Sequence, residues 1–113
     1  MRYLFAVLML AVFLQAAPAV EAHYTSGCQK SKCKKHVIKP HVGTFVSIGA
    51  CESGNSNTAH NPGGQYHGRY QFDLGSWKGA GGYGDPHQFG YLEQTYRAVV
   101  WLHRNGRQSW PNC

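Results

Sequence analysis

Four cysteines place the strongest constraint on this chain, because it is too short to rely on a hydrophobic core alone. The sequence has 113 residues, and its cysteines are Cys28, Cys33, Cys51 and Cys113. A domain of this size buries only about 60 to 65% of its unfolded surface, so cross-links contribute much of its stability. Four cysteines allow three disulfide pairings, and counting alone does not select one.

The possible bridges differ in how strongly they would restrict the unfolded chain. A bridge from Cys51 to Cys113 spans 62 residues, and the chain-entropy model assigns it about 4 kcal/mol. A bridge from Cys28 to Cys33 spans five residues and is assigned about 2 kcal/mol. The longer bridge would join Cys113 to the middle of the chain.

Residues 1–22 have the pattern of a secretory signal peptide. An apolar run extends from Tyr3 to Leu14, and small residues follow as far as Ala22. A membrane-spanning helix needs about 20 apolar residues, whereas Gln15 ends this run early. We therefore expect a secreted, extracellular protein, an environment that favours disulfides.

A basic segment, residues 23–41, follows the signal peptide. Five lysines and few apolar residues occupy it, and the whole chain has a formal net charge of +6. We interpret residues 23–41 as an appended leader with a small disulfide loop, and residues 42–113 as the domain proper. The five lysines are Lys30, Lys32, Lys34, Lys35 and Lys39.

The same segment has an alternative interpretation as a metal site. Cys28, Cys33, His36 and His41 are four potential ligands within fourteen residues. Their spacing matches no zinc finger, and secretion favours oxidation of the thiols. We therefore expect neither a metal nor a cofactor.

Residues 42–113 predict three helices. Thr44 can cap a first helix that ends at Gly54, and Asp73 can cap a second, short helix. The longest helical pattern runs from about Phe89 to Asn105, and the glycine that follows would end it. Helices are therefore expected to dominate the domain.

One segment has the period of a strand. From Tyr66 to Phe72, aromatic residues and glycine alternate with polar residues, after a turn signal rich in proline and glycine. The predicted fold class is therefore α+β, with a short β region beside the dominant helices.

Acidic residues are scarce after the signal peptide, so each of them is informative. Asp85 precedes a proline in a turn, and Glu93 has an ion-pair partner one helical turn away. Glu52 lies in the last turn of the first predicted helix, where the helix dipole and burial both favour the protonated form. A protonated carboxyl group in a cleft is a potential general acid.

Four short blocks occur in a fixed order along the domain. They are residues 51–54 (CESG), 68–73 (GRYQFD), 75–77 (GSW) and 110–113 (WPNC). Together they resemble the resuscitation-promoting-factor and transglycosylase-like family of secreted, lysozyme-fold muralytic proteins, over about Phe45 to Cys113. The combination is far more specific than any single block.

The resemblance implies a fold, a bridge and an activity. It implies a compact lysozyme-like domain, a Cys51–Cys113 disulfide and action on the glycan strands of peptidoglycan. The family's catalytic glutamate falls on Glu52. With that pairing, the remaining disulfide would join Cys28 to Cys33.

Further positions carry over one at a time. The family's aspartate after the Gln-Phe pair falls on Asp73, and its substrate-contacting hydroxyl falls on Ser76. A family glutamine aligns with Asn105, which is shorter by one methylene. Independently, aromatic faces and amides suit pyranose rings, and the candidates for such contacts are Tyr70, Gln71, Trp77 and Trp110.

The mechanism that fits these residues begins with proton donation. Glu52 would protonate the glycosidic oxygen between N-acetylmuramic acid and N-acetylglucosamine as the bond breaks. The next step is open: Asp73 could assist as a second carboxylate, or it could only cap a helix. In that second case a hydroxyl of the sugar itself would attack, as in lytic transglycosylases.

A non-catalytic role is the alternative interpretation. A cationic wall-binding or antimicrobial protein could use the lysines of residues 23–41 to bind the anionic bacterial envelope, and the same lysines could assist an enzyme. Nucleic acid is not an expected partner, because the basic segment lacks interleaved aromatic residues. We expect a monomer.

Overall fold

The structure is a computed structural model that describes residues 27–113. The proposed signal peptide lies outside the described residues. Within residues 27–113, no helix is long and apolar enough to cross a membrane. The elements are the helices α2 (Ser31–Ile38), α3 (Val42–Ser53), α4 (Leu74–Gly79) and α5 (Tyr91–Asn105), with 3-10 turns at Lys39–His41, Pro86–Gln88 and Arg107–Ser109.

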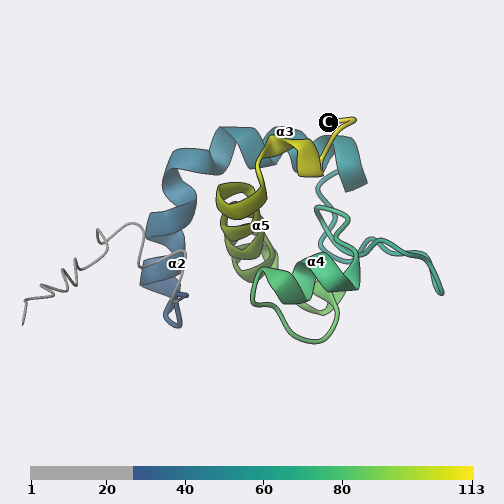
Figure 1. Ribbon diagram of the computed structural model, residues 1–113, viewed down its shortest axis with the longest axis horizontal. Coiled ribbons are helices and arrows are strands. Elements are labelled where there is room, and N and C mark those ends of the chain that lie inside the picture. Colours follow the sequence, from purple (N-terminus) through teal and green to yellow (C-terminus); the bar gives the residue numbers. More distant parts are fainter. Residues whose placement is uncertain (1–26) are drawn as a thin grey trace, which may run out of the picture.

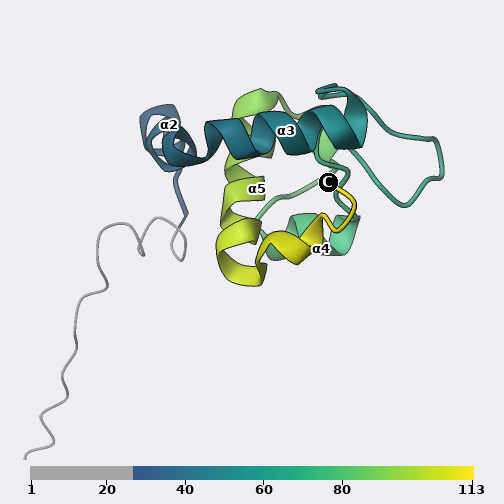
Figure 2. The same cartoon turned by 90° about the horizontal axis from the view of Figure 1, so that it is seen from above.

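Helix α5 is the centre around which the other helices pack. Figures 1 and 2 show α3 crossing one end of α5, with α2 beside it and α4 on another side. Tyr96, Ala98 and Val99 of α5 are fully buried, and they share one core with Phe45 from α3 and Trp77 from α4. The amphipathic pattern that predicts this helix thus forms the core of the described chain.

The predicted helix ends largely agree with the structure. Asp73 caps α4, its Oδ1 accepting a hydrogen bond from the Ser76 N–H at 2.8 Å. Gly54 ends α3 in the left-handed conformation, with φ of 65°. The predicted cap at Thr44 is wrong, because α3 begins at Val42 and continues directly from the preceding 3-10 turn.

The predicted β region is reduced to isolated bridges. Among the described residues, His67 pairs with Phe72 and with His60, without a continuous strand. Gly68 and Gln71 both have positive φ, 81° and 53°, so the chain turns back on itself instead of extending. The helix-dominated architecture is confirmed, and the alternating pattern marks a tight turn.

The basic segment does not form an appended arm over its described part. Cys28, Val37 and Ile38 are buried in the same core as α5. The Cys28 N–H also donates a hydrogen bond to the Tyr96 hydroxyl at 2.6 Å. The few apolar residues of this segment lie at the positions that face α5, so that part of the expectation is wrong. The domain boundary at residue 42 stays a prediction.

One lysine of the basic segment forms an ion pair inside the folded domain. Lys34 forms an ion pair with Glu93 at 2.8 Å, and the same carboxylate accepts a hydrogen bond from Arg97 at 3.1 Å. This pairing fixes α2 to the first turn of α5. The other four lysines, Lys30, Lys32, Lys35 and Lys39, are exposed.

Both expected disulfides are formed. Cys28 joins Cys33 across five residues, and Cys51 joins Cys113 across 62. The alternative interpretation places a metal at Cys28, Cys33, His36 and His41. Both cysteines of that set are joined in the first disulfide, so neither thiol is available as a ligand. That interpretation is therefore wrong.

Replacing both cysteines of the long bridge tests its contribution to stability. We expect Cys51→Ala with Cys113→Ala to lower the free energy of unfolding by about 4 kcal/mol, because the unfolded chain regains a large loop entropy. Urea unfolding of the oxidised proteins measures the change. A loss under about 1 kcal/mol would show that the loop-entropy account does not apply here.

A core substitution tests whether α2 is structural. Ile38 is only 4% exposed, so Ile38→Ala should cost about 2 to 5 kcal/mol of unfolding free energy. The adjacent Lys39→Ala, at an exposed position, should stay within about 0.5 kcal/mol of the parent. Equal stability of both variants in urea unfolding would restore the appended-arm interpretation.

Candidate active site

Glu52 lies in the last turn of α3 and lines a cavity of about 260 Å³. Gly49, one turn earlier, lets α3 approach the turn at residues 68–72 closely. A Cβ at Gly49 would lie 3.2 Å from the Tyr70 ring and would collide with the Asn55 side chain. The opposite wall and rim of the cavity are formed by Tyr66, Gln71, Ser109, Trp110, Pro111 and Asn112.

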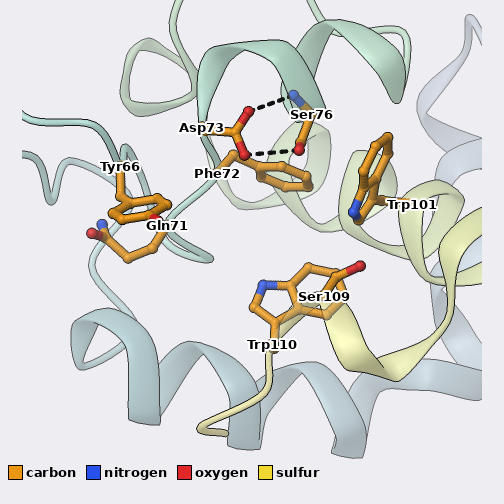
Figure 3. Close-up of a pocket in the computed structure, with 8 residues that line it drawn as sticks. All are labelled: Tyr66, Gln71, Phe72, Asp73, Ser76, Trp101, Ser109 and Trp110. Atoms are coloured by element: carbon orange, nitrogen blue, oxygen red, sulfur yellow. Dashed lines mark hydrogen bonds between the residues drawn. The ribbon is translucent and has the colours of Figure 1, made fainter.

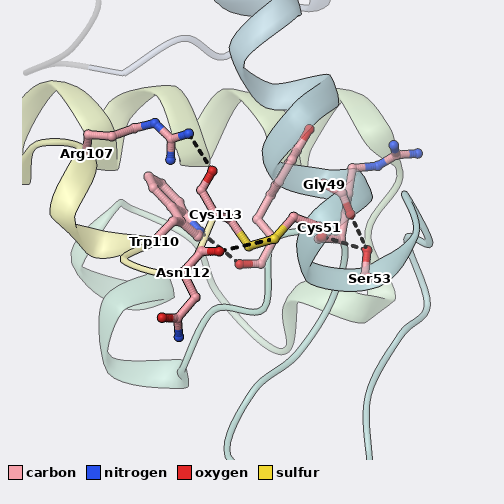
Figure 4. Close-up of a disulfide and its surroundings, with 9 residues drawn as sticks. Gly49, Cys51, Ser53, Arg107, Trp110, Asn112 and Cys113 are labelled. Atoms are coloured by element: carbon pink, nitrogen blue, oxygen red, sulfur yellow. Dashed lines mark hydrogen bonds between the residues drawn. A yellow bond between two sulfur atoms is a disulfide. The ribbon is translucent and has the colours of Figure 1, made fainter.

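The C-terminal wall of this cavity is held by three contacts (Figure 4). The Cys51–Cys113 disulfide attaches it to the residue that precedes Glu52. Trp110 donates its indole N–H to the Tyr70 carbonyl at 3.0 Å, and Arg107 donates to the Cys113 carbonyl at 2.8 Å. The wall is therefore fixed to both α3 and the turn that carries Gln71.

The Glu52 carboxyl group is available for chemistry. Partial burial raises its pKa above the usual value for a glutamate. Its side chain makes no hydrogen bond or ion pair with another residue of the described chain. A carboxyl group with a raised pKa keeps its proton to higher pH, and this one faces an open cavity. These are the properties of a general acid.

A second hollow of about 60 Å³ adjoins the first (Figure 3). Asp73, Ser76, Phe72 and Trp101 line it, together with side chains that line both hollows. The two hollows share four lining side chains and are therefore adjacent, with Glu52 in one and Asp73 in the other, and we call them together the cleft. The shared side chains are Tyr66, Gln71, Ser109 and Trp110.

The Asp73 carboxylate is held by its own helix. Oδ1 accepts the Ser76 backbone N–H and Oδ2 accepts the Ser76 hydroxyl, each at 2.8 Å. The backbone hydrogen bond from Ser76 is the main cause of a lowered pKa for Asp73. Asp73 is therefore ionised at neutral pH, in contrast to the tendency of Glu52.

Gln71 points into the cleft from an unusual backbone conformation. Its φ is 53°, in the left-handed region that non-glycine residues rarely adopt. The side-chain amide donates a hydrogen bond to the Gly68 carbonyl at 2.8 Å, which holds it in place. Such conformations persist where the surrounding structure fixes them, and they are frequent at functional sites.

The structure brings together five of the predicted site residues and leaves three outside. Tyr70 is buried, with its hydroxyl 2.6 Å from that of Thr95, and burial raises its pKa to about 12. Trp77 lies in the core and donates to the Tyr83 carbonyl at 3.0 Å. Asn105 bonds its own helix and lines neither hollow. Those that line the cleft are Glu52, Gln71, Asp73, Ser76 and Trp110.

Sequence reasoning missed several residues of the cleft. Tyr66 falls in the predicted strand, where only its aromatic ring indicates a sugar contact. Ser109 and Asn112 carry no signal of their own, since the turn after α5 places Ser109 and the long disulfide holds the segment that carries Asn112. A search for polar residues next to Cys113 could have found Asn112.

A comparison with protein families decides where the chain belongs. The family model described as the transglycosylase-like domain matches residues 41–113. The chain is a member of the transglycosylase-like domain family. The matched range includes every residue of the cleft and begins just after α2.

One curated relative of this transglycosylase-like protein supports the same assignment. The resuscitation-promoting factor Rpf of Micrococcus luteus is 39% identical over 72 residues. The similar region is 64% of this chain and 32% of the relative, so the chain spans about a third of the relative's length. The shared part is therefore the domain and not the whole relative.

Proposed function

We propose that this protein cleaves the glycan strands of peptidoglycan at the β-1,4 bond between N-acetylmuramic acid and N-acetylglucosamine. Membership in the transglycosylase-like family supports this class of activity. The observation that carries the proposal is Glu52, a carboxyl group with a raised pKa in a cleft of the matched domain. The family also supports a lysozyme-like fold for these helices.

Glu52 is the general acid in this proposal. As the glycosidic bond breaks, Glu52 transfers its proton to the leaving oxygen, and the sugar ring develops oxocarbenium character. The raised pKa keeps a larger fraction of Glu52 protonated at neutral pH. Its freedom from other described side chains leaves the proton available to the substrate.

The second step needs no further protein acid. Of the four described acidic residues, Asp85 contacts histidines and Glu93 pairs with Lys34, away from the cleft. Asp73 reaches the cleft, but both of its oxygens accept hydrogen bonds from Ser76. We therefore assign capture of the sugar to its own 6-hydroxyl, which bonds to the anomeric carbon and gives its proton to the Glu52 carboxylate. This step yields a 1,6-anhydro product and restores the protonated acid. Asp73 acts as a helix cap whose negative charge faces the cleft.

The cleft offers the groups that bind a pyranose. Tyr66, which is 49% exposed, presents an aromatic face, and Gln71 and Asn112 present amides, whereas Trp110 lines the hollow but is only 5% exposed. All four lie in the hollow that contains Glu52. We propose that they hold the two sugars on either side of the scissile bond, with Ser76 contacting the sugar chain further along.

The exposed lysines support an accessory role. Lys30, Lys32, Lys35 and Lys39 are exposed on and next to α2, on a chain of formal net charge +6. We propose that they attract the anionic bacterial envelope after secretion of the protein as a monomer. Lys34 takes no part, since it is paired with Glu93.

The variant Glu52→Gln tests the enzymatic role. Glutamine keeps the shape of the side chain but cannot donate a proton, so release of soluble fragments from purified peptidoglycan should fall by about 10² to 10⁴. Sedimentation with insoluble peptidoglycan should show unchanged binding. Asp73→Asn is the matched control, because asparagine also caps helices and should leave most of the activity.

Two outcomes would contradict the proposal in different ways. Equal release by the parent and Glu52→Gln would place the general acid elsewhere. A folded parent that binds peptidoglycan but releases nothing from it, or from chitin oligomers, would favour the non-catalytic cationic binding protein.

A further inference from the structure

Three side chains distant from Glu52 in the sequence form a cluster with metal-ligating groups. His67, Asp85 and His87 each place one potential ligand atom so that all three lie within 4.8 Å of one another. We propose that this cluster is a binding site for a divalent transition metal, with Zn²⁺ as its occupant, which departs from the expectation that the chain binds no metal. The site is independent of the proposed glycosidase activity.

The two histidines face the same carboxylate from two sides. His67 Nδ1 lies 3.1 Å from Asp85 Oδ2, and His87 Nδ1 contacts Asp85 Oδ1. Two imidazole nitrogens with one carboxylate oxygen form a ligand set typical of zinc, with a fourth position open to water. Calcium and magnesium prefer oxygen ligands throughout, so the histidines disfavour them.

His67 supplies an independent observation. It is only 9% exposed, yet its Nδ1 makes no hydrogen bond, although a carboxylate oxygen lies 3.1 Å away. This distance is short enough for a hydrogen bond, so it is the orientation of the imidazole ring toward the carboxylate oxygen that prevents one. Buried polar atoms are normally satisfied. A cation between His67 and Asp85 would satisfy this nitrogen where the hydrogen bond does not.

Two features of the fold hold the cluster together: the close approach of Gly68 to Pro86 and the buried side-chain amide of Gln94. A Cβ at Gly68 would lie 3.1 Å from Pro86, so glycine lets the two segments meet. The fully buried Gln94 accepts the Arg69 N–H and donates to the Phe89 carbonyl, each at 2.7 Å. The ligand-bearing segments are thus fixed to α5 before any ion binds, which lowers the entropic cost of binding.

His60 covers one side of the cluster. Its ring stacks on that of His87 with centroids 3.8 Å apart and an interplanar angle of 11°. His60 Nδ1 lies 3.0 Å from the Thr58 carbonyl, which orients the ring. We assign His60 a positioning role, since a stacked ring shields the ligand face without itself ligating.

A bound ion would connect the cleft to the rest of the domain. His67 exchanges two backbone hydrogen bonds with Phe72, at 2.9 and 3.0 Å. Tyr66 and Gln71, which line the cleft, are the chain neighbours of this pair. Zinc at the cluster would therefore fix the cleft-bearing turn to the segment that begins at Asp85.

Zinc titration of the untagged, disulfide-bonded protein tests the site. Calorimetry with ZnCl₂ should show one saturable ion per chain, and Asp85→Asn and His87→Gln should each bind at least about tenfold more weakly. Asparagine still caps the turn at Asp85, so that variant should remain folded. His103→Gln, at the far end of α5, is the matched control and should bind as the parent does.

A thermal measurement gives a second readout. Saturating Zn²⁺ should raise the unfolding midpoint of the parent by about 5 °C or more, and should not raise that of His87→Gln. The proposal is overturned if the parent shows no saturable binding, or if the two cluster variants bind zinc as tightly as the parent. Either result would leave the cluster as a hydrogen-bonded cap of the turn.

Discussion

The Cys51–Cys113 disulfide joins the last turn of α3 to the C-terminal segment, and the candidate cleft depends on this junction. Trp110 and Asn112 face Glu52 because Cys113 is attached to the residue next to it. Noncovalent contacts add to the bridge, notably the Trp110 indole on the Tyr70 carbonyl. The same link that restricts the unfolded chain therefore also assembles the site.

Helix α5 provides the second level of organisation. Its buried face forms the core, and its first turn pairs Glu93 with Lys34 of α2. The side-chain amide of Gln94 binds backbone groups of two loops. These polar contacts are buried or half-buried, where unsatisfied groups are costly. The cleft and the histidine cluster thus lie on segments that α5 and the long bridge hold in place.

Much of this arrangement follows from local sequence, and the remainder depends on distant contacts. The cap at Asp73, the helix end at Gly54 and the extent of α5 are local features, and patterns predicted them closely. The position of Glu52 followed from its helix. Residues 66–72 predict a strand but form a turn, because two positive φ values override the strand-like alternation.

Other features were beyond a local pattern. Val37 and Ile38 are two apolar residues in a segment rich in lysine. The composition of that segment therefore does not predict that they are buried against α5. Tyr70 and Trp77 were expected in the cleft but lie in the core, since an aromatic residue suits either environment. The cluster of His67, Asp85 and His87 joins residues that only the folded chain brings together.

The central claim is that the cleft at Glu52 breaks glycan strands with a single protein acid. Mass spectrometry of the fragments released from purified peptidoglycan by the parent protein tests it most directly. The account predicts fragments that end in 1,6-anhydro-N-acetylmuramic acid. Fragments with hydrolysed reducing ends would contradict capture by the sugar's own hydroxyl, and cleavage confined to peptide bonds would contradict the glycosidase itself.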